Sequence, residues 1–140
     1  MDKHLDLIRA IQSSNVEMVS ILLESEASKW LNNYDDIAFT PLMWAAKNNN
    51  LDIVKMLLKA SADVNIHDEQ RIGNTVLREV IDTCSYEMVQ TLVEAGADPT
   101  IPGWMQLTAL DKAVERLEND NNAENREILD LIHRTINKGA

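Results

Sequence analysis

Residues that break helices and residues that favour strands are both scarce in this chain of 140 residues. It has 3 prolines, 4 glycines and only 4% aromatic residues. Proline and glycine interrupt helices, and aromatic side chains are enriched in strands. With 45% hydrophobic residues, this composition predicts a mostly helical globular protein and argues against a β-sandwich.

Patterns typical of secreted and membrane-spanning proteins are also missing. Cys84 is the single cysteine, so the chain cannot form an internal disulfide. Charged residues interrupt the first twenty positions, and the apolar runs are far shorter than the about 20 residues that cross a bilayer. We therefore expect a cytoplasmic protein, in a reducing compartment.

Basic residues are in the minority. Lys and Arg number 13 against 23 Asp and Glu, a net charge of −10, and the acidic residues are spread over both halves of the chain. Nucleic acids and anionic membranes bind to basic surfaces. The composition therefore excludes both as main partners and is compatible with a basic protein partner.

The sequence does contain an internal repeat. Thr40, Thr75 and Thr108 open three similar segments that start 35 and 33 residues apart. An apolar run follows two of these openings, and an equivalent run stands near the start of the chain. The three runs are Met18–Leu23, Ile53–Leu58 and Met88–Val93.

Each recurring position has a physical reason. Thr40 can cap a helix with its hydroxyl group while Pro41 occupies the first turn, where its missing N–H has no cost. The apolar residues of 53–58 recur at helical spacing and form one face, which a neighbouring unit must cover. Gly96 supplies a left-handed turn at the end of the second helix, and Ser61 takes the same position at a cost of about 1 kcal/mol.

Thr40-Pro41-Leu42 and Ala62-Asp63-Val64-Asn65 resemble the ankyrin repeat, a unit of about 33 residues that opens with Thr-Pro-Leu-His. The fourth position departs from this opening, because Met43, Arg78 and Asp111 replace the histidine. The resemblance extends from Leu5 to His133 and implies an all-α ankyrin-repeat solenoid. The implied single domain, 1–140, divides into units near 1–34, 35–69, 70–102 and 103–140.

The ends of the chain differ from its middle. Seven extra residues between Thr108 and Ile128 include the polar run 118–122, which predicts an elongated final helix pair joined by a loop. Charged residues at both ends predict capping units that keep the free protein monomeric. The charged ends, together with Met1 at the start, favour a complete small protein. The charged residues at the two ends are Asp2, Lys3, Asp6, Arg134 and Lys138.

Residues capable of catalysis are present but not in a catalytic arrangement. His4, His67 and His133 fall in three different units and at no metal-ligand spacing. Cys84 lies in the expected turn between two helices, with no histidine nearby in the repeat alignment. We therefore predict a protein that is not an enzyme and that needs neither a cofactor nor a metal.

The resemblance implies a binding face, because ankyrin-like proteins bind other proteins through the finger loops and first helices that line a concave surface. Large apolar residues on these loops are typical of interaction sites. Phe39 is either one of them or part of the core. The predicted contact residues are Asp36, Ile37, Phe39, Lys47, Asn48, Glu69, Gln70, Glu79, Asp82, Trp104, Met105 and Glu115.

These features predict a non-catalytic module whose acidic concave face binds a basic protein, with Trp104 and Met105 as apolar anchors. Small size and strong acidity suggest a specific form, an inhibitor or immunity protein of a toxin such as a nuclease. The alternative is a regulatory adaptor or effector that holds a partner without blocking it. The sequence leaves both open.

Overall fold

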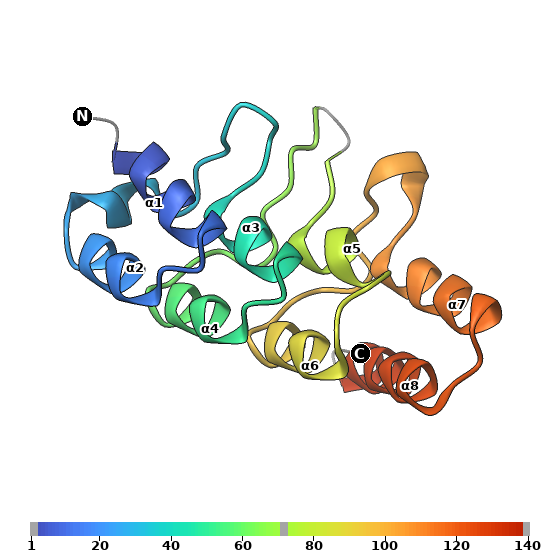
Figure 1. Cartoon of the computed structure of the whole chain (residues 1–140). Coiled ribbons are helices and arrows are strands. Elements are labelled where there is room, and N and C mark those ends of the chain that lie inside the picture. The colour runs from blue at the N-terminus through green and yellow to red at the C-terminus, as the bar shows by residue number, and fades with distance from the viewer. Residues whose placement is uncertain (1–2, 71–72, 139–140) are drawn as a thin grey trace. The chain divides into compact units, whose positions relative to one another are not determined.

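Every regular element in residues 3–70 and 73–138, the part of the chain that the computed structural model describes, is a helix (Figure 1). This confirms the all-α helical-repeat class predicted from the sequence. The chain divides into two compact units, Met1–Asp63 and Val64–Ala140. Asp2, predicted to cap one end, lies outside the described residues.

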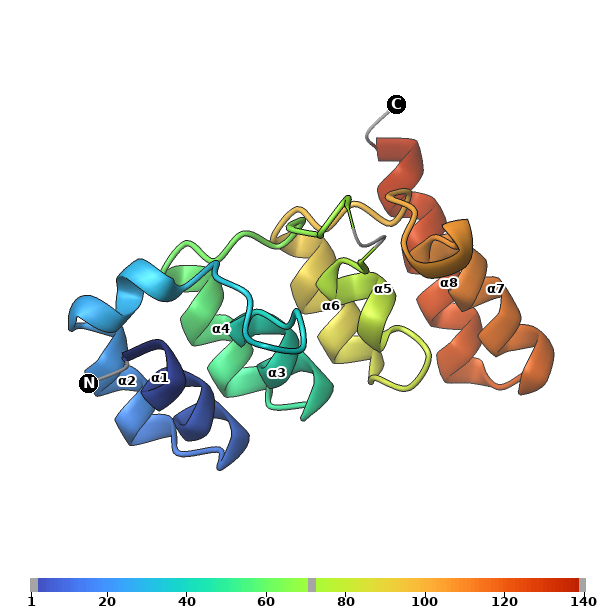
Figure 2. The same cartoon turned by 90° about the horizontal axis from the view of Figure 1, so that it is seen from above.

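The first unit consists of two helical hairpins. In each hairpin a first helix packs against a second one, and α1 also packs on α3 while α2 packs on α4. The first helices therefore form one layer and the second helices another, as Figure 1 shows; Figure 2 shows the same four helices from above. The helices are α1 (Lys3–Gln12), α2 (Val16–Leu23), the short 3-10 helix η1 (Glu26–Trp30), α3 (Pro41–Lys47) and α4 (Leu51–Lys59).

In the second unit α7 packs against α8, and the layers continue with α5 on α7 and α6 on α8. The final helix pair is longer than the others, as expected. The polar run 118–122 is only partly a loop, however, because Glu118 and Asn119 are the last two residues of the preceding helix. The helices are α5 (Val76–Val80), α6 (Tyr86–Glu94), the 3-10 helix η2 (Trp104–Gln106), α7 (Ala109–Asn119) and α8 (Ala123–Lys138).

Side-chain caps fix where these short helices begin. The hydroxyl of Thr40 accepts a hydrogen bond from the backbone N–H of Met43 at 3.3 Å, and Thr75 caps α5 in the same way. At α7, Thr108 and Asp111 form a reciprocal capping box. Isolated helices this short are unstable in water, so a fixed start and burial against neighbours must hold them.

The core of each unit is made of aliphatic side chains contributed by both helix layers. In the first unit these side chains are fully buried and come from all four α-helices: Leu7, Ile11, Val19, Leu42, Ile53 and Leu57. The corresponding side chains of the second unit are Leu77, Ile81, Met88, Leu92, Ile128 and Ile132. Burial of this apolar surface is the main force that stacks the hairpins.

Two asparagines clamp the turns that follow the second helices. Asn32 accepts a hydrogen bond from the backbone N–H of Asp63 at 2.7 Å in the first unit. In the second unit, Asn65 accepts one from Asp98 N at 2.8 Å and donates one to the carbonyl of Gly96 at 2.9 Å. The two asparagines are a repeat period apart and tie successive turns together.

The turn positions Ser61 and Gly96 give a stability test. Both have left-handed backbones, with φ of 77° and 98°, and a Cβ at Gly96 would meet no atom within 4 Å. We expect Gly96→Ala to lower the free energy of unfolding by about 1 kcal/mol through backbone strain alone. Ser61→Gly should raise it by about 0.5 kcal/mol, because relief of strain exceeds the added freedom of the unfolded chain. Urea titrations measure both changes, and equal midpoints for all three proteins would contradict them.

Candidate functional site

The finger loop of the first unit, Asp35–Phe39, is organised by one carboxylate. Asp35 Oδ1 accepts hydrogen bonds from the backbone N–H groups of Ile37 at 3.0 Å and Phe39 at 2.9 Å. Its Oδ2 accepts a third, at 2.7 Å, from the indole Nε1 of Trp44 on α3. Ala38 has a φ of 62°, which closes the turn. Asp35 therefore joins the loop to the helix that follows it.

Aromatic packing supports the same loop. The rings of Phe39 and Trp44 lie 5.1 Å apart in a tilted arrangement, and Lys47 Nζ stands 5.4 Å from the centre of the Phe39 ring. Both aromatic side chains are half-buried. Phe39 thus packs against the body of the unit, with part of its surface still accessible. Lys47 and the α3 cap residue Asn48 are exposed beside it.

The tip of this loop faces solvent. Ile37 is 58% exposed, and its neighbour Asp36 is also exposed. Both residues border a hollow of about 570 Å³ that is also lined by His4 and Leu5 of α1 and by Trp44. The first unit therefore presents an apolar and acidic loop tip beside a shallow depression.

The corresponding loop of the second unit, Gly103–Leu107, is held by residues of α5 and the segment before it. Asn74 Oδ1 accepts the backbone N–H of Trp104 at 2.9 Å, and Arg78 Nε donates to the carbonyl of Leu107 at 3.0 Å. Arg78 is only 8% exposed. A Cβ on Gly103 would collide with the Asn74 side chain, so a larger residue there would displace Asn74 from this contact. Together these contacts pin the base of the loop.

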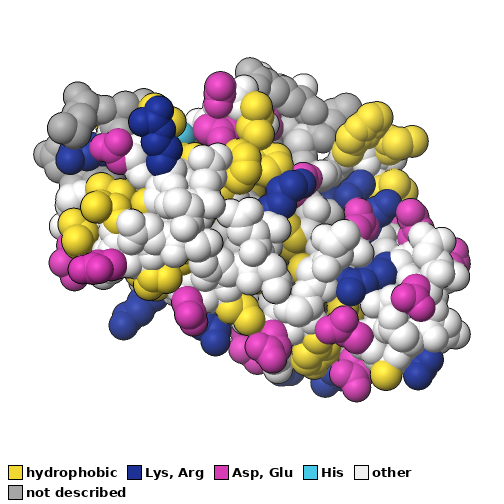
Figure 3. Space-filling model, in the orientation of Figure 1, with side chains coloured by type: hydrophobic (Ala, Val, Ile, Leu, Met, Phe, Trp, Pro, Cys, Tyr) yellow, Lys and Arg dark blue, Asp and Glu magenta, His cyan; other side chains and the backbone are white. Residues whose placement is uncertain are grey.

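Apolar side chains project from the pinned loop. Trp104 is 55% exposed and Met105 70% exposed. Met105 and Gln106 have φ near 60°, so the backbone within the short helix η2 (Trp104–Gln106) is left-handed at these two residues. Figure 3 shows hydrophobic side chains gathered over the loop that carries η2 and over the loop that precedes α3.

Two of the predicted acidic contact residues meet around a lysine. Lys112 Nζ lies 3.1 Å from Glu115 and 3.8 Å from Asp82, so both carboxylates are partly neutralised. Glu79 accepts a hydrogen bond from Asn74 Nδ2 at 2.7 Å and thereby supports the base of the Trp104 loop. The first-helix surface of the second unit thus carries charges of both signs.

Glu69 and Gln70 stand apart from this group. Both are exposed on the loop before α5, and Gln70 N donates to Asp68 Oδ1 at 3.1 Å. The Glu69 side chain, 84% exposed, lies 3.6 Å from Nε2 of His67. Of the predicted residues in the second unit, Asp82 with Glu115 and Trp104 with Met105 are brought together, and Glu79 joins the latter pair through Asn74.

Two features bear on catalysis, namely whether side chains cluster as metal ligands and the state of Cys84, the one cysteine of the chain. No group of three or more His, Cys, Asp or Glu side chains in those ranges could hold a metal ion. Cys84 is buried between α5 and α6, and its burial raises the pKa of the thiol to about 11, against an opposing effect of Arg116. A thiol with this pKa stays protonated at neutral pH and is a poor nucleophile.

Several residues that matter for the loops were not predicted. Asp35, Asn74 and Arg78 position the finger loops, yet none of them was a candidate site residue. Arg78 did give a signal, since it stands at the fourth position of the repeat opening, where the histidine is replaced. Its buried side chain shows that the substitution has a structural purpose in the second unit.

Stacked helical hairpins with capped starts and projecting loops define an all-α helical-repeat protein. A family model described as ankyrin repeats (3 copies) matches residues 6–68, and this confirms the predicted ankyrin repeats over that part of the chain. Ankyrin repeats are in general protein–protein interaction modules, typically without catalytic activity. No curated protein matches the chain. None of the helices in the described ranges has the length and apolar character that a membrane crossing requires.

The raised pKa of Cys84 predicts a pH dependence of stability. The unfolded thiol loses its proton near the ordinary pKa of 9.0, whereas the folded thiol keeps it up to about 11. Between these values the unfolded state binds fewer protons, so stability falls as pH rises, by about 1 kcal/mol per pH unit. Urea titrations from pH 8 to 11 should show this fall, and Cys84→Ala should flatten it. Parallel pH profiles for the two proteins would contradict the prediction.

The neighbouring residues Asp35 and Asp36 allow a test of how much the hydrogen bonds of Asp35 stabilise the protein. We expect Asp35→Ala to lower the free energy of unfolding by about 2 kcal/mol, because two backbone N–H groups and the Trp44 indole lose a charged acceptor. The matched control is Asp36→Ala, which removes an exposed carboxylate one position away and should stay within about 0.5 kcal/mol of wild type. Chemical denaturation measures both, and the result is contradicted if the two variants behave alike.

Proposed function

We propose that the chain is a non-catalytic module that binds a protein partner through its finger loops and first-helix surfaces. The observation that carries this proposal is the exposure of Ile37, Trp104 and Met105 on loops whose bases are pinned by hydrogen bonds. Exposed tryptophan and methionine are frequent anchors of interfaces. Because the loops are already held in place, little conformational freedom is lost on binding.

We further propose that the partner is basic. The net charge of −10 favours encounter with a cationic protein, and Asp36 and Glu69 add exposed carboxylates near the loops. Asp82 and Glu115 contribute less, since each is within 4 Å of Lys112. Charges at the rim of an interface mainly raise the association rate and make it sensitive to salt.

A small acidic interaction module is suited to neutralise a basic toxin, such as a nuclease, by covering its active site. This inhibitor or immunity role is the specific form of the proposal. The alternative is an adaptor that holds the same partner and leaves its active site accessible. The activity of the partner in the complex separates them, because an inhibitor abolishes that activity and an adaptor preserves it.

Affinity capture from the native cell, followed by measurement of the dissociation constant of the captured partner, tests the proposal. Trp104→Ala should weaken binding at least about tenfold if the loop is an anchor. Reversing Asp36, Glu69 and Asp82 to lysine should slow association and weaken its salt dependence. Ile21→Ala is the control, since Ile21 is 54% exposed but lies on α2, which is neither a finger loop nor a first helix. Binding that survives both sets of substitutions would rule out this surface.

A further inference from the structure

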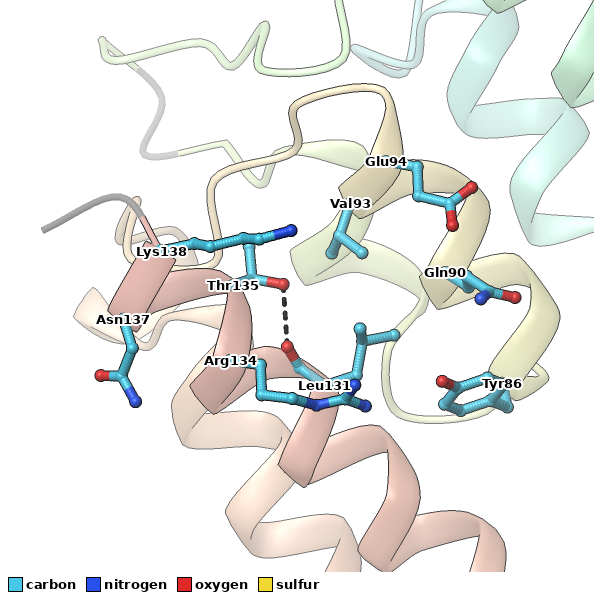
Figure 4. Close-up of a pocket in the computed structure, with 9 residues that line it drawn as sticks. All are labelled: Tyr86, Gln90, Val93, Glu94, Leu131, Arg134, Thr135, Asn137 and Lys138. Atoms are coloured by element: carbon cyan, nitrogen blue, oxygen red, sulfur yellow. Dashed lines mark hydrogen bonds between the residues drawn. The ribbon is translucent and has the colours of Figure 1, made fainter.

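A groove in the second unit runs between the second helices α6 and α8, apart from the loops and first helices considered above. It encloses about 890 Å³ (Figure 4). Tyr86 and Val93 of α6 and Leu131 of α8 supply its apolar lining, and all three are half-buried. The same two helices also contribute fully buried apolar residues to the core of the unit, among them Met88, Leu92, Ile128 and Ile132. The groove therefore has a firm apolar floor.

The α8 side of the groove is cationic. Arg134 and Lys138 follow Leu131 at helical spacings of three and seven, so the three residues share one face of α8. Figure 4 shows both basic side chains reaching from α8 toward α6. Both residues were predicted to belong to a charged capping unit at the end of the chain. The structure places their side chains in the lining of this groove.

The local charge is opposite to that of the protein. Residues 131–138 contain Arg134, Lys138 and one histidine but no acidic residue, in a chain with a net charge of −10. Neither cation forms an ion pair with another residue in the described ranges, and Glu94 is the single carboxylate of the lining. An apolar floor beside two cations is complementary to a ligand that is apolar on one face and anionic at its edge.

We propose that this groove binds an acidic amphipathic helix of a partner protein. The apolar ridge of the helix would lie on Val93 and Leu131, and its flanking carboxylates would pair with Arg134 and Lys138. This is the helix-in-groove mode of recognition, in which residues at helical spacing anchor the ligand. Leu131 and Lys138 are about 10 Å apart along α8, which matches two turns of a bound helix. An adjoining hollow of about 530 Å³, also lined by Val93 and Thr135, extends the groove.

The site is independent of the proposed function, which uses finger loops and a basic partner. Its test uses the full chain and a designed helical peptide of about 14 residues, with leucine at helical spacing on one face and glutamate at its flanks. Two matched peptides carry lysine in place of glutamate, or glutamine in place of leucine. Backbone amide shifts measured by NMR locate the bound peptide, and their concentration dependence gives its dissociation constant.

We expect the glutamate peptide alone to bind, with shifts confined to α6, α8 and the adjoining turn. Arg134→Glu combined with Lys138→Glu should raise its dissociation constant at least about tenfold. Arg126→Glu makes one such charge reversal on the same helix, outside the groove lining, and should alter the constant by less than about twofold. Circular dichroism checks that each variant is folded.

Three outcomes would overturn the proposal. These are absence of binding by the glutamate peptide, equal binding by the lysine or glutamine peptide, and shifts that fall on the finger loops instead of α6 and α8. A fourth outcome would also overturn it. If Arg126→Glu weakened peptide binding as much as the combined Arg134→Glu and Lys138→Glu substitutions, the peptide would respond to net charge and not to this groove.

Discussion

A two-helix hairpin cannot bury its apolar side without a neighbour, and this constraint governs the rest of the structure. The hairpins here are short, and α3 has only seven residues. Such helices are unstable alone, so their persistence depends on stacking in each unit and on caps such as Thr40 that fix where each one starts. Loops between stacked hairpins are then held at their bases and can project at their tips.

The parts of the fold that arise from nearby residues could be predicted from the sequence. A capping threonine bonds to the backbone N–H three positions further along, and a left-handed turn depends only on the residue that adopts it. Thr108 and Gly96 therefore indicated a helix start and a turn from the sequence alone. The apolar faces of the second helices were equally visible from their spacing. The extent of α7 was not, because Glu118 and Asn119 are polar residues that suit a loop or an exposed helix end.

The candidate site was only partly predictable, for the same physical reason. The apolar loop tips could be named because large exposed hydrophobic residues are unusual in loops. The groups that hold the loops could not, since Asn74 contacts Trp104 across thirty positions and Arg78 contacts Leu107 across twenty-nine. Ion pairing of Asp82 with Lys112 likewise joins the turn after α5 to α7. A count of acidic residues therefore overstates the negative charge of the first-helix surface.

The hydrogen bonds at the loop bases end on main-chain atoms. Arg78 bonds to a carbonyl, Asn74 to an amide N–H, and Asp35 to two amide N–H groups. Backbone groups are the same whatever side chain stands at the position. Substitutions at Trp104, Met105 or Ile37 can therefore alter what the loops recognise while their conformation is retained. This separation lets specificity evolve, or be engineered, without remaking the scaffold.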